Sequence, residues 1–549
     1  MTDSMRFTRR KLLKSTAYLG GTAALMQLPF ASNAWARASF ENGPVVETSE
    51  GKVRGLIDDD VYVFRGLRYG ASTAGDGRFL PPRKPPSWTG IWEAFQFGPM
   101  APQFNPNQPR PTDKFYPIQT PDVPESEDCL RLNIYTTRLQ QGAKLPVMVW
   151  LHGGGFSTGA TSMPLFHGGG LARKGAVVVT INHRLNVFGY TWLGDLLGGE
   201  FATSANAGLL DIVQALNWVR DNIAGFGGDP GSVTIFGESG GGAKVSCVMA
   251  MPAARGLFHR AIIESGPGLT MDTQEAAARV TSALLDAAGL KPAQAHDLQK
   301  LDIRQLLTAY YSAARSLGGG PGAGGFQPVV GDSALPRNPF TPDATPLSAE
   351  VPLLIGTNLH EAAFFTRNMP AQADMDEAAL KQRLAAYPTL NADEAIATYR
   401  HDFPGASPWK LSLLVASDFF MRQNSIVLAE RKSKQAAPVY MYRFDWETPA
   451  LGGHRGAMHT VELPFVFNNL NENRWLIGKS RGDQRLADLM SNTWVAFARS
   501  GNPDNSRIPH WPTYNTDKRT TMIFNLRPKV VDDPAADVRK LIGKAMHYS

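Results

Sequence analysis

The chain has 549 residues, of which 43% are hydrophobic and 19% are charged, a composition typical of globular proteins. Much of its formal charge of +6 lies in the first 36 residues, which hold five basic residues and one acidic one, so the remainder carries 50 Lys and Arg against 48 Asp and Glu. This near balance gives no reason to expect a nucleic-acid partner.

The N-terminus has the features of an export signal. Residues 8–14 read TRRKLLK, a twin-arginine pattern, and a weakly apolar run follows over residues 16–30, before the small-x-small sequence of residues 34–36. We interpret residues 1–36 as a Tat signal peptide, cleaved after Ala36 or Ala38, that delivers the folded chain to the bacterial Tat machinery. The mature protein is then periplasmic or secreted. The apolar run is short and interrupted, so a retained anchor is the less favoured alternative, and we expect no stable membrane span in the mature chain.

The first elements are short strands in Pro- and Gly-rich surroundings, where residues 61–64 and 65–69 predict an antiparallel edge. Apolar, β-branched runs downstream are typical of strands buried on both faces, and segments with helical periodicity alternate with them. Strands are predicted at 132–135, 147–151, 177–181, 232–236, 261–263, 352–355 and 439–443, and helices at 209–223, 274–288, 377–386, 418–434 and 485–499. This alternation predicts an α/β fold with a large, mostly parallel, twisted sheet, helices on both faces and an N-terminal antiparallel edge.

The glycine-rich stretch 317–325 is either an interdomain linker or a mobile loop. A domain boundary there would separate the residues that we expect to act together. We therefore favour a loop near the mouth of the site, and a single domain over residues 37–549.

A G-x-S-x-G pentapeptide at residues 237–241 lies between the predicted strand 232–236 and a stretch of small residues. A strand that turns sharply into a helix strains the residue at the bend, and the flanking glycines leave room for that bend. Ser239 is therefore a candidate nucleophile. The alternative is a Gly-rich turn with a solvated serine.

A serine nucleophile needs an imidazole base and a carboxylate that orients the imidazole. In the α/β-hydrolase order, the acid and then the base follow the serine. His454, His459 and His510 all qualify as the base by position, and Asp332 competes with Glu361 for the acid. The residues alone leave these choices open.

The oxyanion of the reaction needs preorganised N–H donors, which in this fold come from the residue after the nucleophile and from a glycine loop after an earlier strand. Gly240 follows the serine, and the sequence HGGGF at residues 152–156 follows the predicted strand 147–151. Glycine suits this place because no side chain stands between the backbone N–H groups and the substrate.

From Pro44 to Trp511 the chain resembles the type-B carboxylesterase family, which includes bacterial nitrobenzyl esterases, mammalian carboxylesterases, fungal lipases and cholinesterases. The stretches that carry the resemblance are SEDCLRLNI at 126–134, WLHGGGF at 150–156, NWVRDNI at 217–223, FGGDP at 226–230, FGESG at 236–240, GLFHRAI at 256–262 and ESG at 264–266. The resemblance implies an α/β-hydrolase fold for the single domain.

The resemblance also implies roles for individual residues. Ser239 matches the nucleophile, Glu361 in GTNLHE matches the acid, and His459 matches the base. Gly154 and Gly155 match the loop donors of the oxyanion hole, with Gly240 as the third. The expected lining of the substrate pocket includes Phe326, in a segment that resembles the family's acyl pocket, and Glu238.

The chain departs from the family pattern at three places. Gly240 stands where alanine is usual, which keeps the N–H donor but loosens the start of the helix. Cys129 lacks the upstream partner of disulfide-bearing members and is expected to be a free, buried thiol. Glycines at 318–320, 322, 324 and 325 replace bulk near the acyl pocket, which suggests a wide acyl site.

These observations predict a serine carboxylesterase that hydrolyses small-molecule esters through a Ser-His-Glu triad and an acyl-enzyme, with no cofactor and no metal. Alternatives on the same fold are an amide or carbamate hydrolase, or a lipase. An alternative from another class is a catalytically silent, cholinesterase-like binding module, against which an intact Ser, Glu and His argue.

Overall fold

The computed structural model describes residues 43–108, 123–319, 325–366 and 374–548. The predicted signal peptide and residues 320–324 of the glycine-rich stretch lie outside these ranges. The chain divides into two compact units, residues 1–44 and 45–549, and the second holds every strand and helix named below. None of the helices in the described ranges is both long and apolar enough to cross a bilayer.

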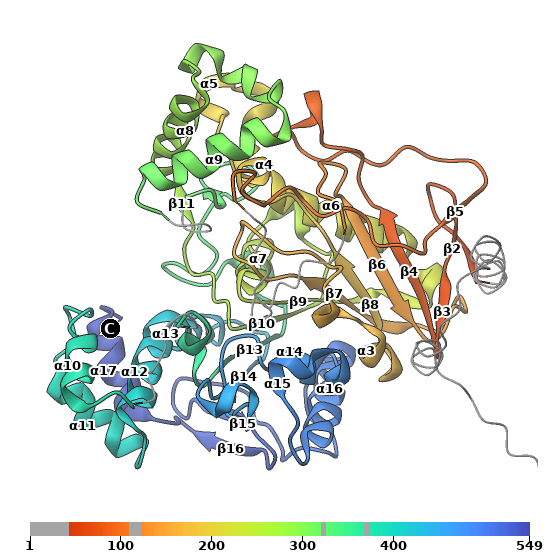
Figure 1. Ribbon diagram of the computed structural model, residues 1–549. Helices are drawn as coiled ribbons and strands as arrows, with labels where there is room; N and C mark the ends of the chain where they lie inside the picture. The colour runs from red at the N-terminus through yellow and green to blue at the C-terminus, as the bar shows by residue number, and fades with distance from the viewer. Residues whose placement is uncertain (1–42, 109–122, 320–324, 367–373, 549) are drawn as a thin grey trace, which may run out of the picture. The chain divides into compact units, whose positions relative to one another are not determined.

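An 11-stranded sheet organises the second unit (Figure 1). Its central strands run parallel to one another, and these are β15, β14, β13, β10, β9, β7 and β8. At the edges, β16 on one side and β6, β4 and β3 on the other are antiparallel to their neighbours. In spatial order the strands are β16 (Lys529–Asp532), β15 (Thr520–Phe524), β14 (Val439–Phe444), β13 (Leu353–Asn358), β10 (Arg260–Glu264), β9 (Gly228–Glu238), β7 (Leu145–Leu151), β8 (Val177–Ile181), β6 (Arg131–Thr136), β4 (Val61–Arg68) and β3 (Leu56–Asp58).

Two small sheets accompany the large one. One contains β1 (Val45–Glu47), β2 (Lys52–Arg54) and β5 (Ile91–Glu93), and the other pairs β11 (Asp272–Thr273) with β12 (Val329–Val330). The predicted strands are all present. The two runs predicted at 61–64 and 65–69 form one continuous strand, β4, at the predicted N-terminal antiparallel edge.

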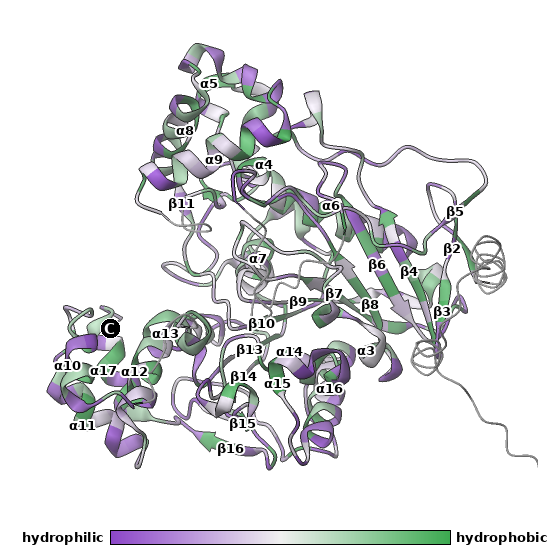
Figure 2. Cartoon of the chain, in the orientation of Figure 1, coloured by the Kyte–Doolittle hydropathy of each residue, from purple (hydrophilic) through white to green (hydrophobic). Residues whose placement is uncertain are grey.

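The central strands are buried on both faces because helices cover both. Along β7, the side chains of Val147 and Val149 enter one hydrophobic core, and those of Met148 and Trp150 enter the other. Helices α6 (Ala207–Asn222), α7 (Gly240–Met249) and α13 (Gln423–Lys432) contribute to the first core, and α3 (Gly169–Arg173), α14 (Leu463–Val466) and α16 (Asp483–Ser500) contribute to the second. Hydrophobic residues accordingly colour much of the central strands in Figure 2. The predicted sheet with helices on both faces is confirmed.

The predicted helices are also found, with one interruption. Helix α8 (Gln274–Ala288) has the predicted bounds, and α10 (Glu377–Leu384) is close to them. The helix predicted over 418–434 begins with a π-helical segment, Asp418–Arg422, before α13. Such wide turns place an extra residue in the helix and often occur at functional sites.

Several helices were not predicted from periodicity. Besides α3 and α14, they are α4 (Asn186–Gly189), α5 (Gly194–Leu197), α9 (Ile303–Ser316), α11 (Ala392–Asp402), α12 (Pro408–Ser417), α15 (Arg474–Ile477) and α17 (Ala536–Ala545). Helices α10, α11 and α12 share a separate hydrophobic core with α17, which lies more than a hundred residues later in the chain (Figure 1).

A buried ion pair joins the end of β8 to α6. The Asp211 carboxylate accepts hydrogen bonds from Nε (2.9 Å), Nη2 (2.6 Å) and the backbone N–H (2.9 Å) of Arg184, and Arg184 Nη1 donates to the Leu80 carbonyl (2.7 Å). The two side chains are 1% and 0% exposed. The arginine is therefore fully desolvated and depends on Asp211 for its countercharge.

Replacing Asp211 by alanine should lower the free energy of unfolding by about 3–5 kcal/mol, because the Arg184 guanidinium would stay buried without its partner. Urea denaturation measures the change. The matched control is Asp221→Ala, whose partner Arg220 is 51% exposed, and which should cost less than about 1 kcal/mol. Equal losses for the two variants would contradict this account.

Candidate active site

Ser239 stands at the turn between β9 and α7 with a strained backbone. Its φ of 57° and ψ of −126° are rarely adopted by a residue with a side chain, at a cost of roughly 1–3 kcal/mol. The turn is fixed because the Ser239 N–H donates to the Glu264 carbonyl at 2.9 Å. Neighbouring backbone comes so close that a Cβ on Gly241 would lie 2.0 Å from the Leu151 oxygen, and one on Gly266 would lie 1.9 Å from the Ser239 oxygen. This is the strand-turn-helix geometry that raises a serine above a sheet.

A buried carboxylate and imidazole lie next to this turn. Nδ1 of His459 is 2.6 Å from Oε2 of Glu361, and the side chains are 3% and 0% exposed. The other oxygen of Glu361 accepts a hydrogen bond from the backbone N–H of Asn358, also at 2.6 Å. Glu361 follows β13. The end of this parallel strand therefore fixes the position of the carboxylate that contacts the imidazole of His459.

The other imidazole nitrogen contacts a second carboxylate. Nε2 of His459 lies 3.1 Å from Oε1 of Glu238, the residue before Ser239. Within the described chain, no hydrogen bond joins Ser239 Oγ to His459. Contacts between a nucleophile and its base are often loose in a free enzyme and tighten only with substrate. The structure thus brings Ser239, Glu361 and His459 to one edge of the sheet, with the imidazole turned toward Glu238.

Burial and charge set the protonation of this group. Burial opposes the charge on His459, but the attraction of Glu238 and Glu361 outweighs it and raises the pKa of His459 to about 9. Burial raises the pKa of Glu238 to about 7, against the opposing effect of His459. Burial likewise raises the pKa of Glu264 to about 8 and that of Glu462 well above its usual range. The site is therefore a cluster of buried carboxyls around one imidazole.

The predicted oxyanion donors lie together beside the serine. Gly154 and Gly155 have φ of 92° and 62°, and a Cβ on Gly154 would meet the Thr158 oxygen at 2.4 Å, so this turn requires glycine. A Cβ on Gly240 would meet the Gly155 oxygen at 2.2 Å, which places the loop directly against the start of α7. The N–H groups of these three glycines have no hydrogen-bond partner in the described ranges.

A cavity of about 610 Å³ opens at Ser239. Phe326 lines it and is joined by Phe420 and Met421 of the π-helical segment. Leu317 and Gly325, which flank the undescribed residues 320–324, also lie in its wall. Glu238 is not part of this lining. Its side chain is 2% exposed and lies against His459, so the structure places it beside the imidazole and not in the wall of this cavity.

The competing candidates lie elsewhere. Nδ1 of His510 pairs with Asp504 at 2.7 Å on the surface. Asp332 accepts from the Asn206 side chain and from the N–H groups of a local turn. His454 contributes a backbone carbonyl to Trp409. His459 alone of the three histidines contacts Glu361.

Sequence reasoning missed the residues that support the imidazole. The Asn358 side chain donates to the carbonyl of Met458 (2.9 Å) and to the carboxyl of Glu462, so it connects the acid loop to the histidine loop. The hydroxyl of Ser417 accepts from the N–H of Ala362, next to the acid. Asn358 could have been found because it belongs to the GTN sequence just before Glu361. Ser417 is 56 residues after Glu361 in the chain, and no sequence pattern around it indicates a contact with the acid.

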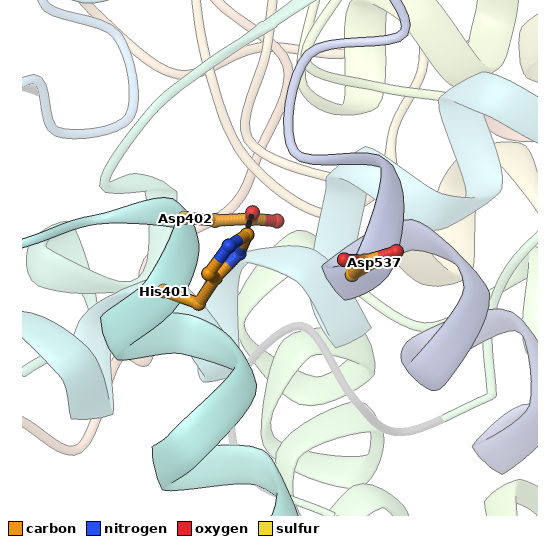
Figure 3. Close-up of side chains that lie close together, drawn as sticks. All are labelled: His401, Asp402 and Asp537. Carbon is orange, nitrogen blue, oxygen red and sulfur yellow. Dashed lines mark hydrogen bonds and ion pairs between the residues drawn. The ribbon is translucent and has the colours of Figure 1, made fainter.

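One other cluster has ligand-type side chains. His401 and Asp402 at the end of α11 and Asp537 at the start of α17 place their ligand atoms within 4.8 Å of one another (Figure 3). Asp402 already contacts Nδ1 of His401 (3.1 Å) and accepts from the N–H of Val538 (3.4 Å). The contacts between the two helix ends account for the cluster, and it does not line the cavity at Ser239.

A serine on a strained strand-to-helix turn, beside an imidazole and a carboxylate at the end of parallel strands, defines a hydrolase of the α/β-hydrolase fold. Comparison with known proteins identifies its kind. Residues 42–540 match the carboxylesterase family. The chain belongs to this family and is a carboxylic ester hydrolase.

Its relatives are similar over nearly their whole length. The para-nitrobenzyl esterase of Bacillus subtilis is 35% identical over 500 residues, which cover 90% of this chain and 98% of that protein. The carboxylesterase EST55 of Geobacillus stearothermophilus has a similar structure, with a TM-score of 0.77, 36% identity, and 90% and 99% of the two chains covered. An esterase of Clostridium hathewayi, described as hydrolysing aliphatic aromatic polyesters, has a TM-score of 0.80 at 34% identity, with 92% and 99% covered.

Glu238→Gln should move the acidic limb of the kcat/KM profile toward lower pH by about one unit or more. A histidine base works only when it is neutral, and removing one of the two carboxylates beside His459 lowers the pKa of this imidazole and keeps it neutral in more acidic solution. Initial rates from pH 5 to 10 give the limb. The control is Glu264→Gln, a buried carboxyl that bonds Trp494 instead and should move the limb less. A limb that stays in place in Glu238→Gln would contradict the assignment.

Proposed function

We propose that this carboxylesterase works through a Ser-His-Glu triad formed by Ser239, His459 and Glu361, with an acyl-enzyme intermediate. The observation that carries the proposal is the buried pair between Glu361 and His459, which lies beside the strained serine that opens into the cavity. An imidazole held at Nδ1 by a carboxylate leaves Nε2 to take up a proton.

In the proposed reaction, Ser239 Oγ attacks the ester carbonyl and gives its proton to Nε2 of His459. For this step the imidazole must exchange its contact with Glu238 for one with Ser239. The N–H groups of Gly154, Gly155 and Gly240 stabilise the tetrahedral oxyanion. His459 then protonates the leaving alcohol, which leaves the acyl group on Ser239. Water repeats the sequence and releases the acid.

The cavity supports a small-molecule ester as substrate. Its volume of about 610 Å³ is in the range of sites that enclose small organic ligands. Phe326, Phe420 and Met421 supply apolar wall, whereas Asp272 and Arg279 are charged. This favours an ester with an extended apolar part, and the wide acyl site expected from the sequence is part of this proposal.

Ser239→Ala in the mature protein, residues 37–549, should lower the hydrolysis of p-nitrophenyl esters by about 10⁴-fold or more, because the nucleophile is removed. Esters from acetate to decanoate give the chain-length profile. The matched control is Ser232→Ala, a half-buried serine on the same strand that contacts Arg260, and it should keep its activity. Wild-type protein should also release a burst of p-nitrophenol equal to the enzyme concentration.

An undiminished Ser239→Ala variant would move the nucleophile elsewhere, and an inactive wild-type protein would favour the binding-module alternative. Rates that fall steeply for every acyl chain longer than acetyl would refute the wide acyl site. Preferential cleavage of the corresponding amides or carbamates would favour that alternative.

We also propose that residues 1–36 direct Tat export and that the mature enzyme is periplasmic or secreted. The support is the twin-arginine sequence and the small residues before position 37. Replacing Arg9 and Arg10 together by lysine should leave active enzyme in the cytoplasm of a bacterial host, as cell fractionation would show. Replacing Arg6 by lysine, outside the pair, is the control. Export that continues without the arginine pair would reject the proposal.

A further inference from the structure

A fully buried lysine lies behind the oxyanion loop. Lys244 is on α7, its side chain is 0% exposed, and it forms no ion pair in the described chain. Its Nζ donates to the carbonyl of His152 at 3.0 Å and to the carbonyl of Gly155 at 2.8 Å. These two carbonyls stand before and after the glycine turn that carries the Gly154 and Gly155 donors.

The surroundings of Lys244 offer dipoles in place of a countercharge. The imidazole rings of His152 and His183 lie near Lys244 and stack on each other, with their centroids 4.7 Å apart. Burial, together with the charge of Lys244, lowers the pKa of both histidines, so they stay neutral. Burial raises the pKa of the Cys247 thiol, which is neutral too. The ring of Phe156 lies 5.6 Å from Nζ. Because burial without a carboxylate partner disfavours the charged ammonium, the pKa of Lys244 is lowered from its usual value to about 7. Buried groups with shifted pKa values gather at functional sites.

Gly240 makes this contact possible. It precedes Lys244 by four residues, so both lie on the same face of α7. A Cβ at position 240 would lie 2.2 Å from the Gly155 oxygen and 2.4 Å from its Cα. The loop therefore occupies the space that an alanine would fill, and in that space the Gly155 carbonyl meets the ammonium.

We propose that Lys244 is a positioning residue that holds the oxyanion loop through the carbonyls of His152 and Gly155 and so aims the N–H groups of Gly154 and Gly155 at the oxyanion. The inference rests on the proposed function, because it assigns a task to the same loop. Lys244 touches neither substrate nor the reacting atoms.

The proposed role of Lys244 should affect kcat and leave KM nearly unchanged. Donors that are aimed at the transition state raise kcat, whereas they contribute little to holding the ground state. Lys244→Met keeps the length of the side chain and removes the charge and the hydrogen bonds. It should lower kcat about 10- to 100-fold, less than the full loss of a donor, and leave KM within about threefold. The inhibition constant of an alkyl trifluoromethyl ketone, which binds as an oxyanion, should rise by the same factor as kcat falls.

The chain contains a matched control. Lys432 on α13 is also 0% exposed and donates to two backbone carbonyls, those of Ser348 (2.8 Å) and Ala349 (3.0 Å). It does not line the cavity at Ser239. Lys432→Met should lose thermal stability like Lys244→Met, but it should keep the wild-type kcat and the wild-type inhibition constant.

A second variant tests the same loop from the other side. In Gly240→Ala the new Cβ would push Gly155 away from the helix, and the same loss of kcat and of ketone affinity is expected with Lys244 intact. This variant decides the question if Lys244→Met does not fold. The proposal is overturned if the folded variant keeps kcat within about twofold, or if ketone affinity falls no more than in Lys432→Met. A wild-type protein that is inactive and does not bind the ketone would instead refute the proposed function together with this inference.

Discussion

Close backbone packing around Ser239 is the constraint on which the site depends. The serine has left-handed backbone angles, and the chain passes it on several sides at distances that leave no room for a Cβ on Gly237, Gly241 or Gly266. Such contacts persist only when the surrounding strands fix them. The two parallel neighbours of β9 surround the turn: β10 supplies the Glu264 carbonyl that accepts from the Ser239 N–H, and at the end of β7 the Leu151 carbonyl occupies the place of a Cβ on Gly241. The sheet therefore both builds the core and holds the serine in its unfavourable conformation.

The second constraint is charge in a buried place. Four carboxyls, those of Glu238, Glu264, Glu361 and Glu462, lie in the same region as one imidazole, and all four are buried. They cannot all be ionised there at neutral pH, because burial and mutual repulsion favour the protonated acid. Glu361 has two short hydrogen bonds, from His459 and from the Asn358 backbone, whereas among the residues that the structure describes the Glu238 carboxyl contacts only the ring of His459. The protons therefore distribute over the whole cluster. In the proposed reaction, the imidazole of His459 exchanges its contact with Glu238 for one with Ser239.

Much of the fold could be predicted because its signals are local. Strands such as β7 are apolar on both faces, and α8 has an amphipathic pattern that ends at Gly289, so their types and bounds follow from a few residues. Helices α11, α12 and α17 were missed because their shared core forms only when segments more than a hundred residues apart meet. The π-helical segment was missed because residues 418–434 read as one continuous helix. A buried hydrogen bond from Tyr399 to Asp418 across helices fixes this region, and no pattern within the segment reveals it.

The residues of the candidate site likewise fall into those that local sequence patterns predict and those that only the folded chain reveals. Ser239 and the glycine loop were found from the chain itself because strain and close approach require glycine at fixed spacing. The choice of His459 over His454 needed the family resemblance, since both lie in similar Gly-rich surroundings and only the folded chain shows which ring reaches Glu361. Lys244 could not be found at all. In a sequence, a lysine on a helix usually indicates a solvated face. Only the folded structure shows that Lys244 Nζ donates hydrogen bonds to two carbonyls of the glycine loop, those of His152 and Gly155.

Gly240 and Lys244 are best understood together. Taken alone, glycine at the start of α7 removes a side chain that would hold the loop at a distance, and it raises the backbone freedom of the residue that carries a proposed donor. A buried lysine without hydrogen-bond acceptors would lack partners for its polar end, and burying such a group is costly. Combined, the first lets the Gly155 carbonyl approach the helix, and the second supplies the hydrogen bond that keeps it there, while the same two carbonyls give the ammonium the partners that burial demands. Both features meet at the Gly155 carbonyl, which is the reason to treat the pair as one device in the proposed support of the oxyanion loop.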